Sequence, residues 1–514
     1  MINSTLDNVV LNSTVIDEIW SQQPAKSMFI SDDKHATYND FLTQVNLFKT
    51  LLADLSSTSV AMCIDNSISW IVVDFACQQL GIVLLPLPHY FSAQQIQHSI
   101  TTAGCDLLIV DAMITEKFIA VFPDAKLIEN ETEMSIYLLD KSTSCLPNNT
   151  SKITFTSGTT GQPKGACLST QHQWLVAKCI ADSISNRVNK HLCVLPLATL
   201  LENIAGIYAP LINGATVEIP SLSALGFVGS SSLNFEKFIQ QINQSQPASL
   251  ITTPEILKGL VQACQMGWQA PQSLQFIAVG GAHTAQSLLD AARKCGLPAF
   301  QGYGLSECCS VVSLNTTDNN NVKSAGKSLP HLDIEIIEDE IVVKGPLFLG
   351  YVGDKSSWNK ASYETGDLGY IDNDGYLFIQ GRKKNILVSS FGRNINPEWI
   401  EASLLAYSQI KQTIVFGDAK PFCSAGIYVD ESVTSSEQVS EIINTLNEQL
   451  PDYAQIKSWF YLPQLILPNS ELMTANGRIR RNLAAVSLSE QLKEIYGDNT
   501  NTNTNTNIKR HRND

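Results

Sequence analysis

Residues 153–169 read ITFTSGTTGQPKGACLS, and the interpretation of the whole chain starts from this stretch. Its loop offers hydroxyl groups, glycines with open backbone N–H groups and the charge of Lys164, which together suit a polyphosphate. The apolar run Lys152 to Phe155 precedes the loop, and a helix is expected after Thr170. The sequence therefore predicts a phosphate-binding loop between a strand and a helix.

The same residues and other short motifs argue against several well-known sites. Pro163 stands where a Walker A loop has glycine, and Gly165 stands where a magnesium-binding Ser or Thr would follow the lysine. Gly302 and Gly304 begin a G-x-G, but Glu307 replaces the last glycine of a dinucleotide-binding motif. There is no Gly-x-Ser-x-Gly elbow, and the eight histidines form no evident metal cluster.

The composition is that of a globular protein with more than one packed unit. The chain has 514 residues, of which 44% are hydrophobic and 16% charged. Its net charge of −15 argues against a broad nucleic-acid surface. The 12 cysteines include no C-x-x-C pair and are expected to be free thiols. No secretory signal is recognised, and polar residues interrupt the apolar segment Ile68 to Leu87, so we expect a cytoplasmic protein without a transmembrane segment.

The pattern of apolar runs predicts an α/β fold with two units of unequal size. Runs such as Val60 to Ile64 and Phe276 to Val279 alternate with helix-like segments, and 371–376 read as a β-hairpin turn. A new α/β rhythm begins after Lys384, with Asn396 as a helix cap. The expected organisation is a large N-terminal α/β domain of several subdomains, a hinge, a small mobile C-terminal α+β lid and a disordered tail, over residues 1–381, 382–385, 386–497 and 498–514.

Several ordered motifs resemble those of the adenylate-forming, or AMP-binding, superfamily, which includes acyl-CoA synthetases and the adenylation domains of peptide synthetases. The phosphate loop is the first of them. The others are Tyr303-Gly-Leu-Ser-Glu307, Tyr363-Glu-Thr-Gly-Asp367, Gly381-Arg382, the stretch from Gly392 to Glu398, and Asn476-Gly-Arg-Ile479. The resemblance covers about residues 150 to 482, and it implies an enzyme that joins a carboxylate to the α-phosphorus of ATP and then transfers the acyl group to a thiol.

The resemblance also implies roles for individual residues. Lys164 and Glu307 would be catalytic, with Glu307 holding Mg²⁺, a hard ion suited to carboxylate oxygen. Lys384 would be the hinge, and Gly392 with Arg393 would line the channel for the thiol. Tyr303 would stack on adenine, and Asp367 with Arg382 would bind the ribose hydroxyls. The full set of expected ATP-binding residues is Thr156, Ser157, Gly158, Thr159, Thr160, Gly161, Lys164, Gly281, Ala282, Gln301, Gly302, Tyr303, Gly304, Ser306, Asp367 and Arg382.

One catalytic position departs from the family pattern. The family places a lysine in the C-terminal Gly-Lys-Ile stretch, where it points at the α-phosphate and the carboxylate, but this chain has Gly477-Arg478-Ile479. Arginine keeps the charge and changes the shape, because a guanidinium is planar and has fixed donor directions. A working enzyme in which Arg478 is catalytic is the main interpretation, and a non-catalytic nucleotide- or acyl-binding relative is the alternative.

The carboxylic acid is predicted from weaker signals. The run from Leu195 to Thr199 resembles a segment of long-chain fatty acyl-CoA synthetases, although Thr199 replaces a histidine. Leu200 and Leu201 stand where amino-acid-activating relatives place an acidic group, so an apolar acid is favoured, with Glu202 one residue away. Leu200, Leu201, Ile204 and Ile207 are candidates for the acyl site and are equally well explained as a core helix. We therefore expect a fatty acid, ATP and either CoA or the phosphopantetheine of a free acyl carrier protein as substrates.

Overall fold

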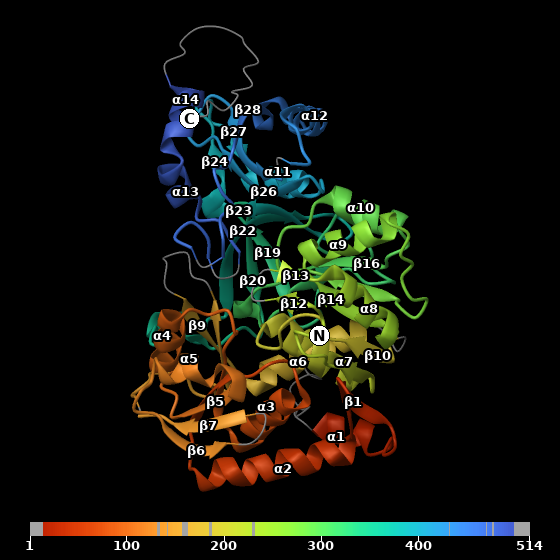
Figure 1. Cartoon of the computed structure of the whole chain (residues 1–514), viewed down its shortest axis with the longest axis vertical. Coiled ribbons are helices and arrows are strands. Elements are labelled where there is room, and N and C mark those ends of the chain that lie inside the picture. The colour runs from red at the N-terminus through yellow and green to blue at the C-terminus, as the bar shows by residue number, and fades with distance from the viewer. Residues whose placement is uncertain are drawn as a thin grey trace.

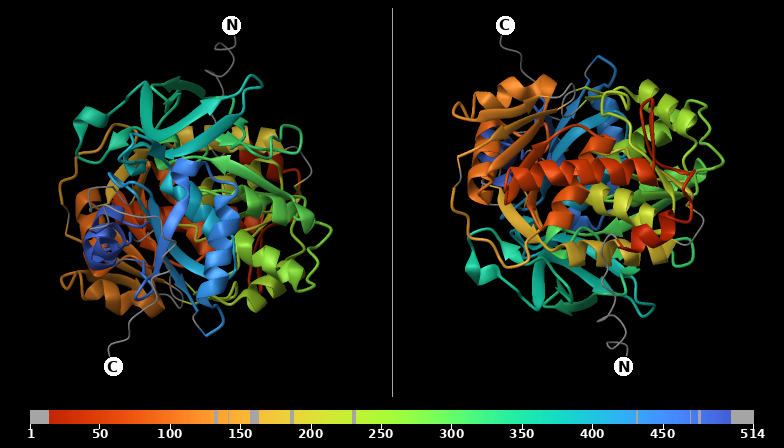
Figure 2. Two further views of the ribbon diagram at one scale, coloured as in Figure 1. Left: turned by 90° about the horizontal axis from the view of Figure 1, so that it is seen from above. Right: turned by 90° about the horizontal axis from the view of Figure 1, so that it is seen from below.

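The computed structural model describes residues 14–130, 134–140, 142–156, 163–184, 188–228, 232–430, 432–468, 470–474 and 477–497. Within them the chain forms a large N-terminal body and a smaller C-terminal unit (Figure 1). Seen from above, the C-terminal unit lies over the body, and seen from below, α2 (Tyr38–Asp54) crosses the base of the body (Figure 2). The predicted fold class, α/β with two units of unequal size, is confirmed.

The first large sheet carries the strands on either side of the phosphate loop. In the described residues it has eight strands in the order β21-β9-β8-β4-β3-β5-β7-β6. Strands β3, β4, β5 and β8 run parallel. The bounds are β3 (Ser59–Cys63), β4 (Val83–Pro86), β5 (Leu107–Asp111), β6 (Lys126–Asn130), β7 (Met134–Leu138), β8 (Lys152–Thr156), β9 (Lys164–Leu168) and β21 (Gly350–Tyr351).

The phosphate loop connects two strands, which corrects the prediction of a strand followed directly by a helix. β9 pairs antiparallel with β8, so that Lys152 lies opposite Leu168 and Thr156 opposite Lys164. The helix α6 (Thr170–Ile184) begins only after this second strand. The apolar run in β9 is too short for its pattern to indicate a strand, and its conformation depends on pairing with β8.

The second large sheet forms the other half of the body. In the described residues it has nine strands in the order β18-β17-β16-β15-β14-β10-β11-β1-β2. The bounds are β1 (Ser27–Ser31), β2 (Lys34–Thr37), β10 (Lys190–Leu192), β11 (Thr216–Glu218), β14 (Ser249–Thr252), β15 (Phe276–Val279), β16 (Ala299–Tyr303), β17 (Ser313–Leu314) and β18 (Lys327–Ser328).

Helices pack on both large sheets and bury apolar faces against them. The apolar segment from Ile68 to Leu87 forms a helix and a strand: Ser67 caps α3, and Gly81 ends it with a φ of +69°. The bounds are α1 (Thr14–Trp20), α3 (Ile68–Leu80), α4 (Ala93–Ala103), α5 (Thr115–Ile119), a π-helix (Glu202–Tyr208), α7 (Ala209–Ile212), α8 (Phe235–Ser245), α9 (Pro254–Gln265) and α10 (Gln286–Lys294), with a small hairpin of β12 (Phe227–Val228) and β13 (Ser232–Leu233).

A four-stranded antiparallel sheet leads from the body to the C-terminal unit. Its order is β19-β20-β22-β23. The predicted hairpin turn joins β22 to β23, with Ile371 opposite Leu377 and Gly375 at a φ of +82°. The bounds are β19 (Asp333–Ile337), β20 (Glu340–Lys344), β22 (Ser362–Ile371) and β23 (Leu377–Arg382).

The C-terminal unit has apolar clusters of its own. Their buried members run from Leu387 to Leu488. Asn396 caps α11 as predicted, since its Oδ1 accepts hydrogen bonds from the N–H groups of Glu398 and Trp399. The bounds are β24 (Leu387–Val388), β25 (Asn394–Ile395), α11 (Pro397–Leu405), β26 (Ile410–Phe416), β27 (Cys423–Val429), α12 (Ser436–Asn447), β28 (Ile456–Tyr461), α13 (Arg481–Ser487) and α14 (Ser489–Tyr496).

A buried ion pair in the half formed by the first large sheet is hydrogen-bonded to the π-helix, which follows strand β10 of the second sheet. Lys152 Nζ in β8 lies 2.9 Å from Asp74 Oδ1 in α3, and the two side chains are 2% and 0% exposed. Lys152 also donates to Asn203 Oδ1 at 2.5 Å and to the Tyr208 hydroxyl at 2.8 Å, and both of these residues donate to Asp74 Oδ2. The π-helix thereby supplies the hydrogen bonds that make the buried pair tolerable.

Two expectations about the whole chain concern membranes and thiols. Across the described residues, no helix is both long and apolar enough to cross a membrane. All twelve cysteines are free, as predicted, and the neighbouring Cys308 and Cys309 are buried in the main apolar cluster. Burial raises the pKa of the Cys309 thiol to about 12, so these two residues act as packing groups.

Lys152→Met should destabilise the fold strongly, because it leaves the Asp74 carboxylate buried without its partner. The expected loss is about 3–5 kcal/mol, measured by thermal and urea unfolding followed by circular dichroism. Lys178→Met is the matched control: Lys178 pairs with Asp182 at 2.5 Å, but these side chains are 39% and 58% exposed. The control should lose about 1 kcal/mol or less. Equal shifts in the two variants would contradict the role assigned to the buried pair.

Candidate active site

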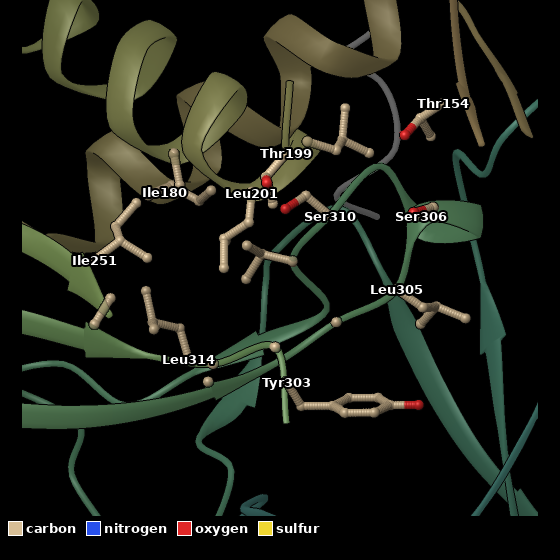
Figure 3. Close-up of a pocket in the computed structure, with 18 of the residues that line it drawn as sticks. Thr154, Ile180, Thr199, Leu201, Ile251, Tyr303, Leu305, Ser306, Ser310 and Leu314 are labelled. Carbon is tan, nitrogen blue, oxygen red and sulfur yellow. The ribbon is translucent and has the colours of Figure 1, made fainter. Parts of the chain in front are cut away.

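A cavity of about 760 Å³ lies between the two large sheets and extends towards the C-terminal unit. One end is polar and contains Lys164, Glu307, Arg382 and Arg478. The other end is mainly apolar, and Figure 3 shows the side chains of Ile180, Leu201, Ile251 and Leu314 gathered on the side opposite Thr154 and Ser306. Further residues of the apolar end are Ala181, Ile184, Val188, Ala205, Ala209, Pro210, Leu250 and Phe276.

The segment that begins at Tyr303, at the end of β16, packs closely against residues 310–312. This contact orients the residues of the segment. A Cβ atom added to Gly304 would stand 1.7 Å from the Ser310 carbonyl oxygen, so only glycine fits there. The Tyr303 carbonyl also accepts a hydrogen bond from the Val312 N–H at 2.8 Å. Tyr303, Gly304, Ser306 and Glu307 consequently all line the cavity.

Asp367 is the centre of a charged cluster formed by the hairpin β22–β23. Arg382 lies opposite Asp367 in the strand register, and Arg382 Nε is 2.7 Å from Asp367 Oδ1. The Tyr303 hydroxyl donates to Asp367 Oδ2 at 2.5 Å. Burial raises the pKa of the Asp367 carboxyl, and the Arg382 guanidinium opposes that shift. Two of the predicted ribose-binding residues are therefore paired, and the predicted adenine-stacking residue contacts them.

Glu307 has chemistry that fits a hard cation. Its Oε1 accepts a hydrogen bond from the Tyr351 hydroxyl at 2.6 Å, and Tyr351 also contacts the Tyr363 hydroxyl at 3.0 Å. The described residues give the second carboxylate oxygen no hydrogen-bond donor, so it remains available as an oxygen ligand of the kind Mg²⁺ prefers. Lys164 Nζ lies 5.0 Å from the centre of the Tyr351 ring, which places the loop lysine beside this carboxylate. Sequence reasoning missed Tyr351, because it belongs to no motif quoted above.

Three cations converge from two units. Arg478, Arg382 and Lys384 all line both the cavity and a larger cleft of about 2540 Å³ between the body and the C-terminal unit. Burial within the cleft and the charge of Arg382 lower the pKa of Arg478. Burial, Arg382 and Arg478 likewise lower the pKa of Lys384. Burial is the larger cause of both shifts, and the neighbouring positive charges add to it.

Only some of the other predicted site residues line the cavity or the cleft. Gly281, with a φ of +83°, and Ala282 line the interunit cleft together with Gln301 and Gly302. Gly392 and Arg393 line neither the cavity nor the cleft. Residues Ser157, Gly158, Thr159, Thr160 and Gly161, the Thr156 side chain and Asn476 lie outside what the structure describes.

The predicted acyl-site residues separate into two groups. Leu200 and Leu201 line the cavity, whereas Ile204 and Ile207 are buried in the main apolar cluster and do not line it. Their places along the cavity are taken by Ala205 and Ala209, which sequence reasoning missed because it could not fix the phase of the π-helix. Glu202 is fully buried and does not line the cavity, so it is not available to bind a substrate ammonium group.

Comparison with known proteins gives two family matches. Residues 16–352 match the model for AMP-binding enzymes, and residues 384–500 match the model for the C-terminal domain of AMP-binding enzymes. The 2-succinylbenzoate–CoA ligase of Bacillus velezensis is 25% identical over 84% of this chain and 90% of its own length. The long-chain-fatty-acid–CoA ligase FadD15 of Mycobacterium bovis is 24% identical over 83% and 86%.

A solved structure shares the fold. The o-succinylbenzoate–CoA synthetase MenE of Bacillus subtilis, in complex with ATP and a magnesium ion, superposes with a TM-score of 0.73. It is 23% identical to this chain and covers 91% of it and 98% of its own length.

Arg382→Gln should weaken ATP binding by about tenfold to a hundredfold, because it removes a charged partner from the proposed ribose site. It should also raise the pKa of Asp367 further. Since the ribose hydroxyls need an ionised acceptor, the loss of ATP affinity on acidification should begin at a higher pH than in the unaltered chain. Isothermal titration calorimetry at a series of pH values measures both effects.

The matched control for this variant is Lys344→Gln, which breaks an exposed pair with Glu335 at 2.5 Å. It should change neither the affinity nor its pH dependence. If the ATP affinity of Arg382→Gln has the same value and pH dependence as that of the control, the proposed role of the Asp367 cluster is wrong.

Proposed function

Because the chain belongs to the AMP-binding enzyme family, we propose that it activates an apolar carboxylic acid with ATP and transfers the acyl group to CoA. Membership in the family confirms the resemblance found in the motifs and makes the protein an AMP-forming acid–thiol ligase. One observation carries the proposal: Lys164, Glu307, Arg382 and Arg478 meet at one end of a cavity whose other end is apolar.

The polar end supports the first half-reaction. A carboxylate oxygen bonds to the α-phosphorus while the bond from that phosphorus to the oxygen bridging to the β-phosphate breaks and pyrophosphate leaves. Both reactants are anions, so positioning and charge neutralisation dominate. We assign the phosphates to Lys164 and the phosphate loop, the ribose to Asp367 and Arg382, and the reacting carboxylate and α-phosphate to Arg478. Magnesium held by Glu307 would neutralise phosphate charge when bound.

The second half-reaction needs a thiol to reach the acyl carbonyl and displace AMP. Gly392 and Arg393 stand away from the cavity in this structure, so the proposed channel requires the C-terminal unit to rotate about Lys384. The relatives reported above are CoA ligases, which favours CoA over a carrier protein as the thiol donor.

We infer the class of carboxylic acid from the residues that line the cavity. The relatives divide between an aromatic acid and fatty acids, and they do not support the fatty acid in particular that the sequence predicted. In the described residues, the cavity's lysines and arginines all lie at the polar end, so a second carboxylate at the apolar end would meet neither lysine nor arginine there. We therefore infer a single carboxylate on an apolar body. The succinylbenzoate ligase favours an aryl body, and the depth of the cavity along the π-helix and α7 favours a chain.

An acid panel tests the function and the substrate class together. The enzyme is incubated with ATP, magnesium and CoA and with benzoate, phenylbutyrate, 2-succinylbenzoate, octanoate or palmitate, and acyl-AMP and acyl-CoA are detected by mass spectrometry. We expect products from phenylbutyrate or the fatty acids and less from the dicarboxylic acid. Ala205→Phe should raise the KM of the best acid by about tenfold or more, since it fills the cavity.

The control for Ala205→Phe is Ile204→Val, which trims the neighbouring core residue and should leave the KM unchanged. If no acid yields acyl-AMP while ATP still binds, the proposed function is wrong. A preference for 2-succinylbenzoate would reject only the single-carboxylate inference.

Arg478→Ala should slow pyrophosphate exchange by about a hundredfold, because it removes a charge aimed at the developing transition state. Arg478→Lys should restore most of that rate, since lysine retains the charge. Thioester formation from a supplied acyl-adenylate is the internal control and should change little. Equal loss in both half-reactions would indicate a structural role for Arg478 instead of a catalytic one.

A further inference from the structure

A cluster of three different metal-ligand side chains lies beside the acyl cavity. His191 lies in β10, and Cys193 is the first residue after that strand, where its N–H still donates to the Glu218 carbonyl of β11 at 2.9 Å. Extended residues two positions apart point to the same face. Glu202 opens the π-helix and faces them. One ligand atom from each of the three residues lies within 4.8 Å of the other two. The sequence pattern could not reveal the cluster, because eight residues of loop and helix start separate Cys193 from Glu202.

All three side chains are buried and two of their polar atoms lack partners. The side chains of His191 and Glu202 are 3% and 0% exposed, and Cys193 is 0% exposed. In the described part of the chain, His191 Nε2 and Glu202 Oε2 have no hydrogen-bond partner. The nearest approach of the pair, Nε2 to Glu202 Oε1, is 3.6 Å and too long for a hydrogen bond. Burying a carboxylate and an imidazole nitrogen in this way is costly unless something else joins them.

The local structure leaves room between these groups and holds them in place. A Cβ atom at Gly206 would stand 2.9 Å from Glu202 Oε1 and 3.0 Å from His191 Nε2, so the space exists only because residue 206 is glycine. His191 Nδ1 contacts Ser249 Oγ at 2.8 Å, which turns Nε2 towards the cluster. The Val194 N–H donates to Glu202 Oε1 at 3.2 Å. Ligands oriented by such outer contacts are typical of protein metal sites.

We propose that His191 Nε2, Cys193 Sγ and the Glu202 carboxylate bind one divalent cation of the zinc class. A mixed nitrogen, sulfur and oxygen donor set suits zinc and its borderline relatives, whereas Mg²⁺ and Ca²⁺ prefer oxygen ligands. His191 and Ser249 also line the acyl cavity, so an ion can reach the cluster from there. The bound cation ties β10 to the start of the π-helix, next to Leu201 of the cavity wall. Coordination replaces the thiol proton of Cys193, which passes to solvent.

Metal binding by the full-length protein tests this site. Metal-free protein is dialysed against Zn²⁺ in excess Mg²⁺ and the bound metal is counted, and Co²⁺ is used as a spectroscopic probe for a thiolate ligand. We expect one equivalent of Zn²⁺ that Mg²⁺ does not displace, and a thiolate-to-cobalt absorption band. Cys193→Ser should abolish the band and weaken binding by at least about tenfold, and Ser249→Ala should weaken it by about tenfold or more.

Cys423→Ser is the matched control, because Cys423 is an equally buried thiol in the C-terminal unit. It should keep both the band and the affinity. Gly206→Ala offers a second test that retains all three ligands but fills the space between them, and it should also weaken binding. Absence of tight Zn²⁺ binding by the unaltered protein would overturn the proposal. So would a cobalt band that survives Cys193→Ser or disappears in Cys423→Ser.

Discussion

The buried pair of Lys152 and Asp74 is the constraint on which the rest of the active site depends. Lys152 is the first residue of β8, the strand that leads into the phosphate loop, and Asp74 belongs to α3. Both charges are completed by Asn203 and Tyr208 of the π-helix, whose neighbour Ala205 lines the acyl cavity. The network therefore connects the strand that precedes the phosphate loop to the helix that supplies part of the cavity wall.

The active site is assembled from two units, and its electrostatics follow from that. The body supplies Glu307 and the Asp367–Arg382 pair, while Arg478 comes from the C-terminal unit across an open cleft. Burial and then the like charges crowded at the polar end lower the pKa values of Arg478 and Lys384. A cluster of positive charges of this kind attracts an anion such as a triphosphate. Gly392 lines neither the cavity nor the cleft, so the proposed thiol step requires the C-terminal unit to move.

Structural features that depend on residues close together in the sequence were predicted. Features that depend on contacts between distant residues were not. The hairpin at Ile371 to Leu377 and the Asn396 cap rest on turn and cap chemistry within a few residues, and both were predicted. The strand β9 was missed because its short apolar run forms a strand only by pairing with β8. The sequence left Ile204 and Ile207 open between the acyl site and the core, and they pack in the core because the π-helix determines which side chains face the cavity.

The sequence by itself determined the family, the order of the motifs and the residue types available for binding phosphate, ribose and a hard cation. These follow from short stretches in which neighbouring residues supply the chemistry together. Only the tertiary structure decided that Tyr303 donates to Asp367, that Tyr351 donates to Glu307, and that His191, Cys193 and Glu202 form one buried cluster. Each of these contacts joins residues whose proximity comes from strand pairing and helix packing. The spacing of residues along the chain carries no information about such distances.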